Sequence, residues 1–204
     1  TLDELSCPAR EKARDWYRVH HSDSNWYENV YEDFREICGI FGIDLRQRVF
    51  RLNNGRFMEE PCIWFSGFCS PGDGACFEGR WHWQSATARM IREYAPQDRE
   101  LHRIADALQS VQKRNLWQLQ AEISHRGRYC HPYSMDITVT RNSPTGQTMT
   151  TDAEAAVSKA LRDLVFWLYR QLENEYDWLT SDAAVDEALL INEYTFTEAG
   201  LCTG

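Results

Sequence analysis

The residues around Cys76 are of the types that could carry out nucleophilic thiol chemistry. A cysteine attacks a carbonyl carbon as the thiolate, so a neighbouring base or a helix N-terminus must lower its pKa. Cys76 would be the nucleophile, and His131 or His82 would serve as the base. Asp73 or Glu78 would then orient that histidine. This set of residues would make the chain a cysteine hydrolase.

The sequence context of Cys76 favours a structural turn over a catalytic loop. The pattern Asp-Gly-x-Cys at residues 73–76 resembles the nucleophile loop of ovarian-tumour-type deubiquitinases, which implies isopeptide hydrolysis. Residues 78–83 have the pattern of a strand, so no helix N-terminus would activate the thiol. The alternative is a tight glycine turn in which Asp73 accepts hydrogen bonds from the turn backbone. We therefore predict no catalytic residue and keep the cysteine hydrolase as an alternative.

The histidines do not have the spacing of a metal site. The candidate ligands are His82, His102, His125, His131 and Cys130. Zinc ligands usually come in closely spaced pairs, such as those in CxxC or HExxH, and the chain contains neither motif. We predict no metal and no cofactor.

Negative charge is concentrated at one end of the chain. Of 204 residues, 22 are Lys or Arg and 31 are Asp or Glu, which gives a net charge of −9. Residues 152–204 contain 11 acidic and 3 basic residues, whereas residues 1–151 are nearly neutral. An acidic segment accelerates encounter with basic partners and repels nucleic-acid phosphates. We therefore predict a protein partner with a basic surface and no direct binding to nucleic acid.

The candidate partner-binding carboxylates lie on two helices that the sequence predicts near the C-terminus. The apolar residues of these helices follow a separate stripe at helical spacing, which leaves the carboxylates on the outer face. The alternative is a solvated face that binds nothing. The candidates are Asp163, Glu173, Glu175, Asp177, Asp182, Asp186 and Glu187.

The hydrophobic pattern predicts a single α+β domain over residues 1–204, with an antiparallel sheet of about five strands and flanking helices. Helical spacing predicts helices at 6–18, 26–41 and 85–94, one ending near 114, and two at 152–178 and 181–191, with Ser85 and Ser181 as N-caps. Alternation predicts strands at 45–52, 62–68, 76–83, 116–124 and 133–140, and a short strand at 194–197. The three parts are then a helical segment at 1–44, the sheet at 45–141 and the acidic helix pair at 152–193.

Two features bear on where the protein acts. No apolar run approaches about 18 residues, the length that spans a bilayer, so we expect no membrane segment. The chain has seven cysteines and no secretory signal pattern. An odd number of cysteines without such a signal is typical of free thiols in the cytoplasm.

Several phrases along the chain resemble one family of phage proteins. The similarity extends over nearly the full length, to small proteins of bacteriophages and prophages labelled "antitoxin of a toxin–antitoxin stability system". The matching phrases are LDELS at 2–6 with Ala9, ARDWY at 13–17, FSGF at 65–68, GDGACFEG at 72–79, IREYAP at 91–96, LExEY at 172–176 followed by LTSD at 179–182, and NEYTFTE at 192–198.

This resemblance implies a non-catalytic inhibitor of phage or mobile-element origin that acts in the cytoplasm of a bacterial host. Such a protein would neutralise a toxin or a host defence effector by stoichiometric binding, as antitoxins and anti-CRISPR proteins do. The alternative within the same resemblance is an accessory phage protein with no inhibitory role.

Overall fold

The computed structural model describes residues 2–20, 25–52 and 54–203. The chain divides into two compact units. One, which we call the terminal unit, comprises residues 1–29 and 172–204, and the other, the central unit, comprises residues 30–171. Helices and antiparallel strands together confirm the α+β class.

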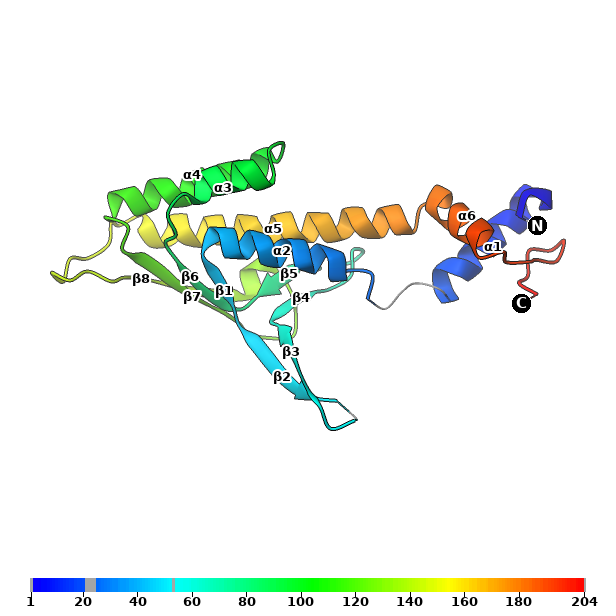
Figure 1. Cartoon of the computed structure of the whole chain (residues 1–204), viewed down its shortest axis with the longest axis horizontal. Helices are drawn as coiled ribbons and strands as arrows, with labels where there is room; N and C mark the ends of the chain where they lie inside the picture. The colour runs from blue at the N-terminus through cyan, green and yellow to red at the C-terminus, as the bar shows by residue number, and fades with distance from the viewer. Residues whose placement is uncertain (1, 21–24, 53, 204) are drawn as a thin grey trace. The chain divides into compact units, whose positions relative to one another are not determined.

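The main sheet of the central unit has four antiparallel strands. Their order across the sheet is β1 (Ile43–Leu45), β6 (Gly79–His82), β7 (Leu119–His125) and β8 (Met135–Arg141). Buried and exposed residues alternate along β6 and over the first part of β7, which is typical of a sheet with one covered face. Figure 1 shows the helices of this unit on one side of the sheet.

Two further pairs of strands complete the β-structure. They are β2 (Gln47–Arg51) with β3 (Phe57–Pro61), and β4 (Ile63–Phe65) with β5 (Ala75–Phe77). The β2–β3 hairpin extends away from the main sheet in Figure 1. The strands predicted at 45–52, 62–68 and 76–83 are therefore wrong in extent. The first and the third are each divided between the main sheet and a separate strand pair, and the second is shortened to β4, which pairs with β5.

Four helices cover the main sheet. They are α2 (Glu28–Phe41), α3 (Thr87–Tyr94), α4 (Arg99–Arg114) and α5 (Ala153–Leu179). The Asp98 carboxylate caps α4 by accepting hydrogen bonds from the amides of Glu100 and Leu101, at 3.0 and 2.9 Å. The predicted Ser85 cap is wrong, because Ala86 precedes α3 in a left-handed conformation and no side chain caps the helix.

The core of the central unit lies between these helices and the sheet. Trp81 on β6 is 1% exposed, and its indole N–H donates to the carbonyl of Phe41 at 3.1 Å. Ile123 on β7 and Leu164 on α5 are fully buried. Each such side chain stabilises the fold by about 1.5–3 kcal/mol.

The terminal unit contains α1 (Cys7–His20), α6 (Asp182–Ile191) and a 3₁₀ turn, η1 (Leu2–Glu4). Leu2, Ala13, Val185 and Leu189 form its buried core. The partly buried aromatic side chains of Trp16, Tyr17, Tyr194 and Phe196 pack against this core.

Contacts at Ser181 and near Gly200 bear on the predicted cap of α6 and on the predicted strand at 194–197. The Ser181 hydroxyl accepts from the amide of Ala184 at 3.3 Å, which confirms the predicted cap of α6. The strand predicted at 194–197 is reduced to one bridge, between Phe196 and Cys202, because the chain turns back at Gly200. No helix in the described part of the chain is long and apolar enough to cross a membrane.

Candidate partner-binding surface

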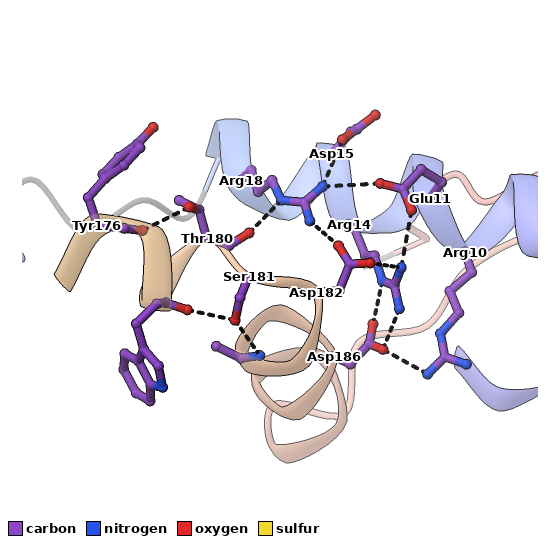
Figure 2. Close-up of polar contacts among 12 residues, drawn as sticks. Arg10, Glu11, Arg14, Asp15, Arg18, Tyr176, Thr180, Ser181, Asp182 and Asp186 are labelled. Atoms are coloured by element: carbon purple, nitrogen blue, oxygen red, sulfur yellow. Dashed lines mark hydrogen bonds and ion pairs between the residues drawn. The ribbon is translucent and has the colours of Figure 1, made fainter. Parts of the chain in front are cut away.

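A two-helix ion-pair network holds α1 against α6 in the terminal unit (Figure 2). The Arg14 guanidinium donates from Nε to Asp186 Oδ1 at 2.8 Å and from Nη2 to Oδ2 at 2.7 Å. Arg10 Nη2 donates to the same Oδ2 at 2.8 Å. The side chains of Arg14 and Asp186 are only 15% and 16% exposed. Hydrogen bonds from Arg14 lower the pKa of Asp186, although partial burial acts in the opposite direction.

Asp182 extends this network by one turn of α6. It accepts from Arg14 Nη1 at 2.7 Å and from Arg18 Nη2 at 2.5 Å. Arg18 also donates from Nε to the carbonyl of Thr180 at 3.0 Å. Two of the predicted partner-binding carboxylates, Asp182 and Asp186, therefore bind arginines of their own chain.

The spacing of basic and acidic residues in the sequence is consistent with this network. Arg10, Arg14 and Arg18 recur every four residues, so a helix places them on one face. Asp182 and Asp186 have the same spacing on the other helix. The spacing of the carboxylates alone does not indicate these arginine partners.

Asp163 is also engaged, within the central unit. Its carboxylate accepts from Arg103 Nη2 and from Lys159 Nζ, both at 2.7 Å. Burial raises the pKa of Asp163, but the hydrogen bonds from Lys159 and Arg103 outweigh it and lower the pKa overall. Asp163 therefore joins α5 to α4.

The other four candidates are not engaged in this way. They are Glu173, Glu175, Asp177 and Glu187, a set of carboxylates that we call the acidic face; Glu173 and Asp177 share one side of α5, Glu175 lies on its other side, and Glu187 is on α6. None of them makes an ion pair or a hydrogen bond with any residue that the structure describes. Their charge is therefore available to a partner.

The two units differ sharply in charge. The terminal unit contains 14 acidic and 4 basic residues, whereas the central unit contains 17 acidic and 18 basic residues. Three of the four basic residues in the terminal unit are Arg10, Arg14 and Arg18, which the network already pairs with carboxylates. The surplus negative charge of the whole chain thus belongs to the terminal unit.

A pocket of about 710 Å³ opens in the terminal unit beside the acidic face. Aromatic side chains supply much of its lining, from Tyr17 on α1, from Trp26, and from Tyr176 and Trp178 at the end of α5. The rings of Trp26 and Tyr176 lie 5.6 Å apart between centroids. Trp178 is 61% exposed, which is unusual for so large an apolar side chain.

Three acidic residues are among the polar residues that line this pocket. Glu28 comes from the start of α2, Glu175 from α5 and Glu187 from α6. Among the lining residues that the structure describes, Arg18 is the one cation, and it is bound to Asp182. The pocket therefore combines aromatic surface with uncompensated negative charge.

The environment of Cys76 does not favour a thiolate. Cys76 lies on β5 and is fully buried. Burial raises the pKa of its thiol well above the ordinary value, and a hydrogen bond with the Cys130 thiol raises it further. A protonated buried thiol is a poor nucleophile.

The proposed catalytic partners of Cys76 are engaged in local structure. Asp73 Oδ2 accepts from the amides of Cys69 and Ser70, at 3.0 and 2.7 Å, as the turn interpretation predicts. The His131 side chain accepts from the amide of Tyr133 at 3.2 Å and caps the short turn η2 (Pro132–Ser134).

The remaining candidates for acid–base or metal chemistry are dispersed. Glu78 accepts from the amide of His125 at 3.1 Å and from Arg46 at 3.0 Å, and the His82 ring lies 3.5 Å from Asp44. The His102 ring lies 2.9 Å from the carbonyl of Ala95. Across residues 2–20, 25–52 and 54–203, no three His, Cys, Asp or Glu side chains gather as a metal site would require.

Comparison with known proteins identifies the family of the chain. Curated proteins and solved structures give no match. A family model described as a domain of unknown function (DUF8835) matches residues 26–182. This range contains the whole central unit and, from the terminal unit, Trp26 and the end of α5 with its pocket residues. Because the match covers well over half of its length, the chain belongs to the DUF8835 family.

Proposed function

We propose that this protein is a non-catalytic inhibitor that binds a partner protein with a basic surface through the acidic face of its terminal unit. The observation that carries the proposal is the set of four unengaged carboxylates in a unit whose arginines are already paired. Its resemblance to the antitoxin-labelled phage proteins supports a phage or mobile-element origin and a toxin or host defence effector as the target. The action would take place in the bacterial cytoplasm.

The physical basis of the proposal is electrostatic complementarity. Toxins that cleave RNA and effectors that bind nucleic acid carry basic surfaces that contact phosphates. An acidic protein face is attracted to such a surface, which raises the association rate, and it blocks the phosphate contacts once it is bound. The protein needs no catalytic group for this task, and in this proposal Cys76 contributes only to the core.

A capture experiment with two charge variants tests the proposal. The full-length chain is immobilised, and bound proteins from a bacterial host lysate are identified and purified. The acidic-face variant carries Glu173→Gln, Glu175→Gln, Asp177→Asn and Glu187→Gln. The control variant removes the same charge from exposed positions of the central unit that make no ion pair among the described residues, through Glu32→Gln, Glu36→Gln, Glu59→Gln and Glu154→Gln.

We expect a captured basic protein to lose its activity when one equivalent of the wild-type chain is added. The acidic-face variant should fail to bind and inhibit it, whereas the control variant should act as the wild type does. Equal inhibition by the two variants would contradict the proposed surface. Binding with no loss of the partner's activity would contradict the inhibitor function.

A further inference from the structure

The pocket beside the acidic face is large enough for more than one side chain. Its volume of about 710 Å³ is within the range of sites that bind ligands of several hundred daltons, about 300–1,000 Å³. A short peptide segment from a partner protein is a ligand of that size. All of the lining residues belong to the terminal unit, so the pocket is formed within one compact body.

The charge of the pocket selects a cationic ligand. Glu28, Glu175 and Glu187 contribute three carboxylates to the lining. Arg18, which could have attracted an anion, donates to Asp182 and to the Thr180 carbonyl instead. A phosphate or carboxylate ligand would therefore meet repulsion, while an ammonium or guanidinium group would be attracted.

The aromatic lining favours a guanidinium among the possible cations. Tyr17, Trp26, Tyr176 and Trp178 line the pocket, so a bound ligand would contact aromatic residues. A planar guanidinium stacks on such rings and is also more weakly hydrated than the ammonium of lysine. It can in addition bind a carboxylate through two parallel hydrogen bonds. Aromatic and carboxylate groups in one pocket thus match both properties of arginine.

The exposure of Trp178 fits the same interpretation. This side chain is 61% exposed, and Ile191, which also lines the pocket, is 72% exposed. Large apolar side chains that remain in water beside a pocket mark interaction sites, and tryptophan is enriched among the residues that dominate binding energy.

We infer that this pocket binds an arginine side chain within a short basic segment of the partner protein. The inference rests on the proposed function, since it names the chemical group that the acidic terminal unit recognises. The acidic face attracts the basic partner at long range, and the pocket then holds one arginine by stacking and by ion pairing.

Peptide titration of the full-length protein tests this inference. Three probes of equal length are compared by calorimetry at pH 7 and low salt, namely hexa-arginine, hexa-lysine and hexa-citrulline. Citrulline has the shape of arginine without its charge. We expect hexa-arginine to bind about 5- to 10-fold more tightly than hexa-lysine, because only the guanidinium stacks well, and hexa-citrulline not to bind.

Two variants distinguish the contribution of aromatic stacking to peptide binding from the contribution of charge. Trp178→Ala should weaken hexa-arginine binding by about 5- to 10-fold, and because Trp178 is mostly exposed the variant should fold normally by circular dichroism. The double variant Glu175→Gln/Glu187→Gln should weaken both cationic peptides, whereas Glu59→Gln/Glu154→Gln should weaken neither. Equal affinity for arginine and lysine peptides, together with unchanged binding by Trp178→Ala, would overturn the inference.

The outcomes distinguish this inference from the proposed function. If Trp178→Ala leaves arginine binding intact while the acidic-face variant no longer captures the partner, the pocket inference is wrong and the proposed function stands. If the arginine peptide binds as expected while partner capture does not depend on the acidic face, the pocket inference stands and the proposed function is wrong.

Discussion

The network between α1 and α6 predicts that replacing one carboxylate, in Asp186→Asn, will loosen the terminal unit. Asp186 accepts three charge-assisted hydrogen bonds of 2.7–2.8 Å, two from Arg14 and one from Arg10. An asparagine at this position has no charge and only one acceptor oxygen. The two guanidinium groups would then lose their main shared partner.

The size of the effect follows from the number of bonds and from their exposure. A hydrogen bond to a charged group contributes about 1.5–3 kcal/mol to stability. Three such bonds do not add fully, because Arg14 keeps Asp182 and Glu11 as partners and Arg10 is 34% exposed to water. We therefore expect the free energy of opening the terminal unit to fall by about 2 kcal/mol, a factor of about 30 in the opening equilibrium.

Hydrogen exchange of the α1 backbone amides measures this opening directly. Exchange of these amides should be about 30-fold faster in Asp186→Asn than in the wild type, with the core of the central unit unaffected. Glu187→Gln is the matched control, because it removes the same charge from the next residue of α6 without breaking an ion pair among the described residues. Equal exchange in the two variants would refute the structural role of Asp186.

The pH dependence of the same variant gives a second readout. Because the pKa of Asp186 is lower in the folded than in the unfolded chain, its stabilising effect is complete above its unfolded pKa and is lost as the pH falls through its folded pKa. The difference between the wild type and Asp186→Asn should therefore be constant from pH 5 to 7 and shrink below about pH 4. A difference that grows on acidification would contradict this assignment.

Three further predictions concern other parts of the chain. Gly200→Ala should destabilise the terminal unit by about 2 kcal/mol or more, measured by exchange in α1, because Gly200 has φ +80° and a Cβ would lie 2.1 Å from the Ala9 carbonyl oxygen. Gly39→Ala, where a Cβ meets nothing within 4 Å, should leave stability unchanged or raise it by up to about 1 kcal/mol in urea unfolding. A maleimide at pH 7.5 should label the exposed Cys7 and Cys69 at least about 100-fold faster than Cys76, as mass spectrometry of the native protein would show, and rapid labelling of Cys76 would restore the cysteine hydrolase as a function.

Local sequence patterns predict the helices well because a helix is formed by neighbouring residues. The helix predicted at 152–178 is α5 (Ala153–Leu179), and the one predicted at 181–191 is α6 with its Ser181 cap. Strand boundaries were harder to predict, because a strand is defined by its pairing partner. β1 pairs with β6 across more than 30 residues, and no local pattern near Leu45 indicates where that pairing ends.

The candidate site also depends on contacts between residues far apart in the sequence, which local patterns do not predict. The spacing of carboxylates predicts an acidic helix face, but it does not say which of them bind arginines of the same chain. Asp186 lies 172 residues from Arg14, so their contact depends on the folding of the terminal unit. The pocket was not predicted, because Trp26 and Trp178 come together only through that folding.

The central claim is that the acidic face of the terminal unit binds a basic protein, and the dissociation constant of the purified captured partner tests it most directly. The constant is measured at 0.15 M NaCl for the wild type, the acidic-face variant and the control variant. We predict that affinity falls by at least about 10-fold for the acidic-face variant and by less than about 2-fold for the control variant. Equal affinities for the two variants would contradict the claim.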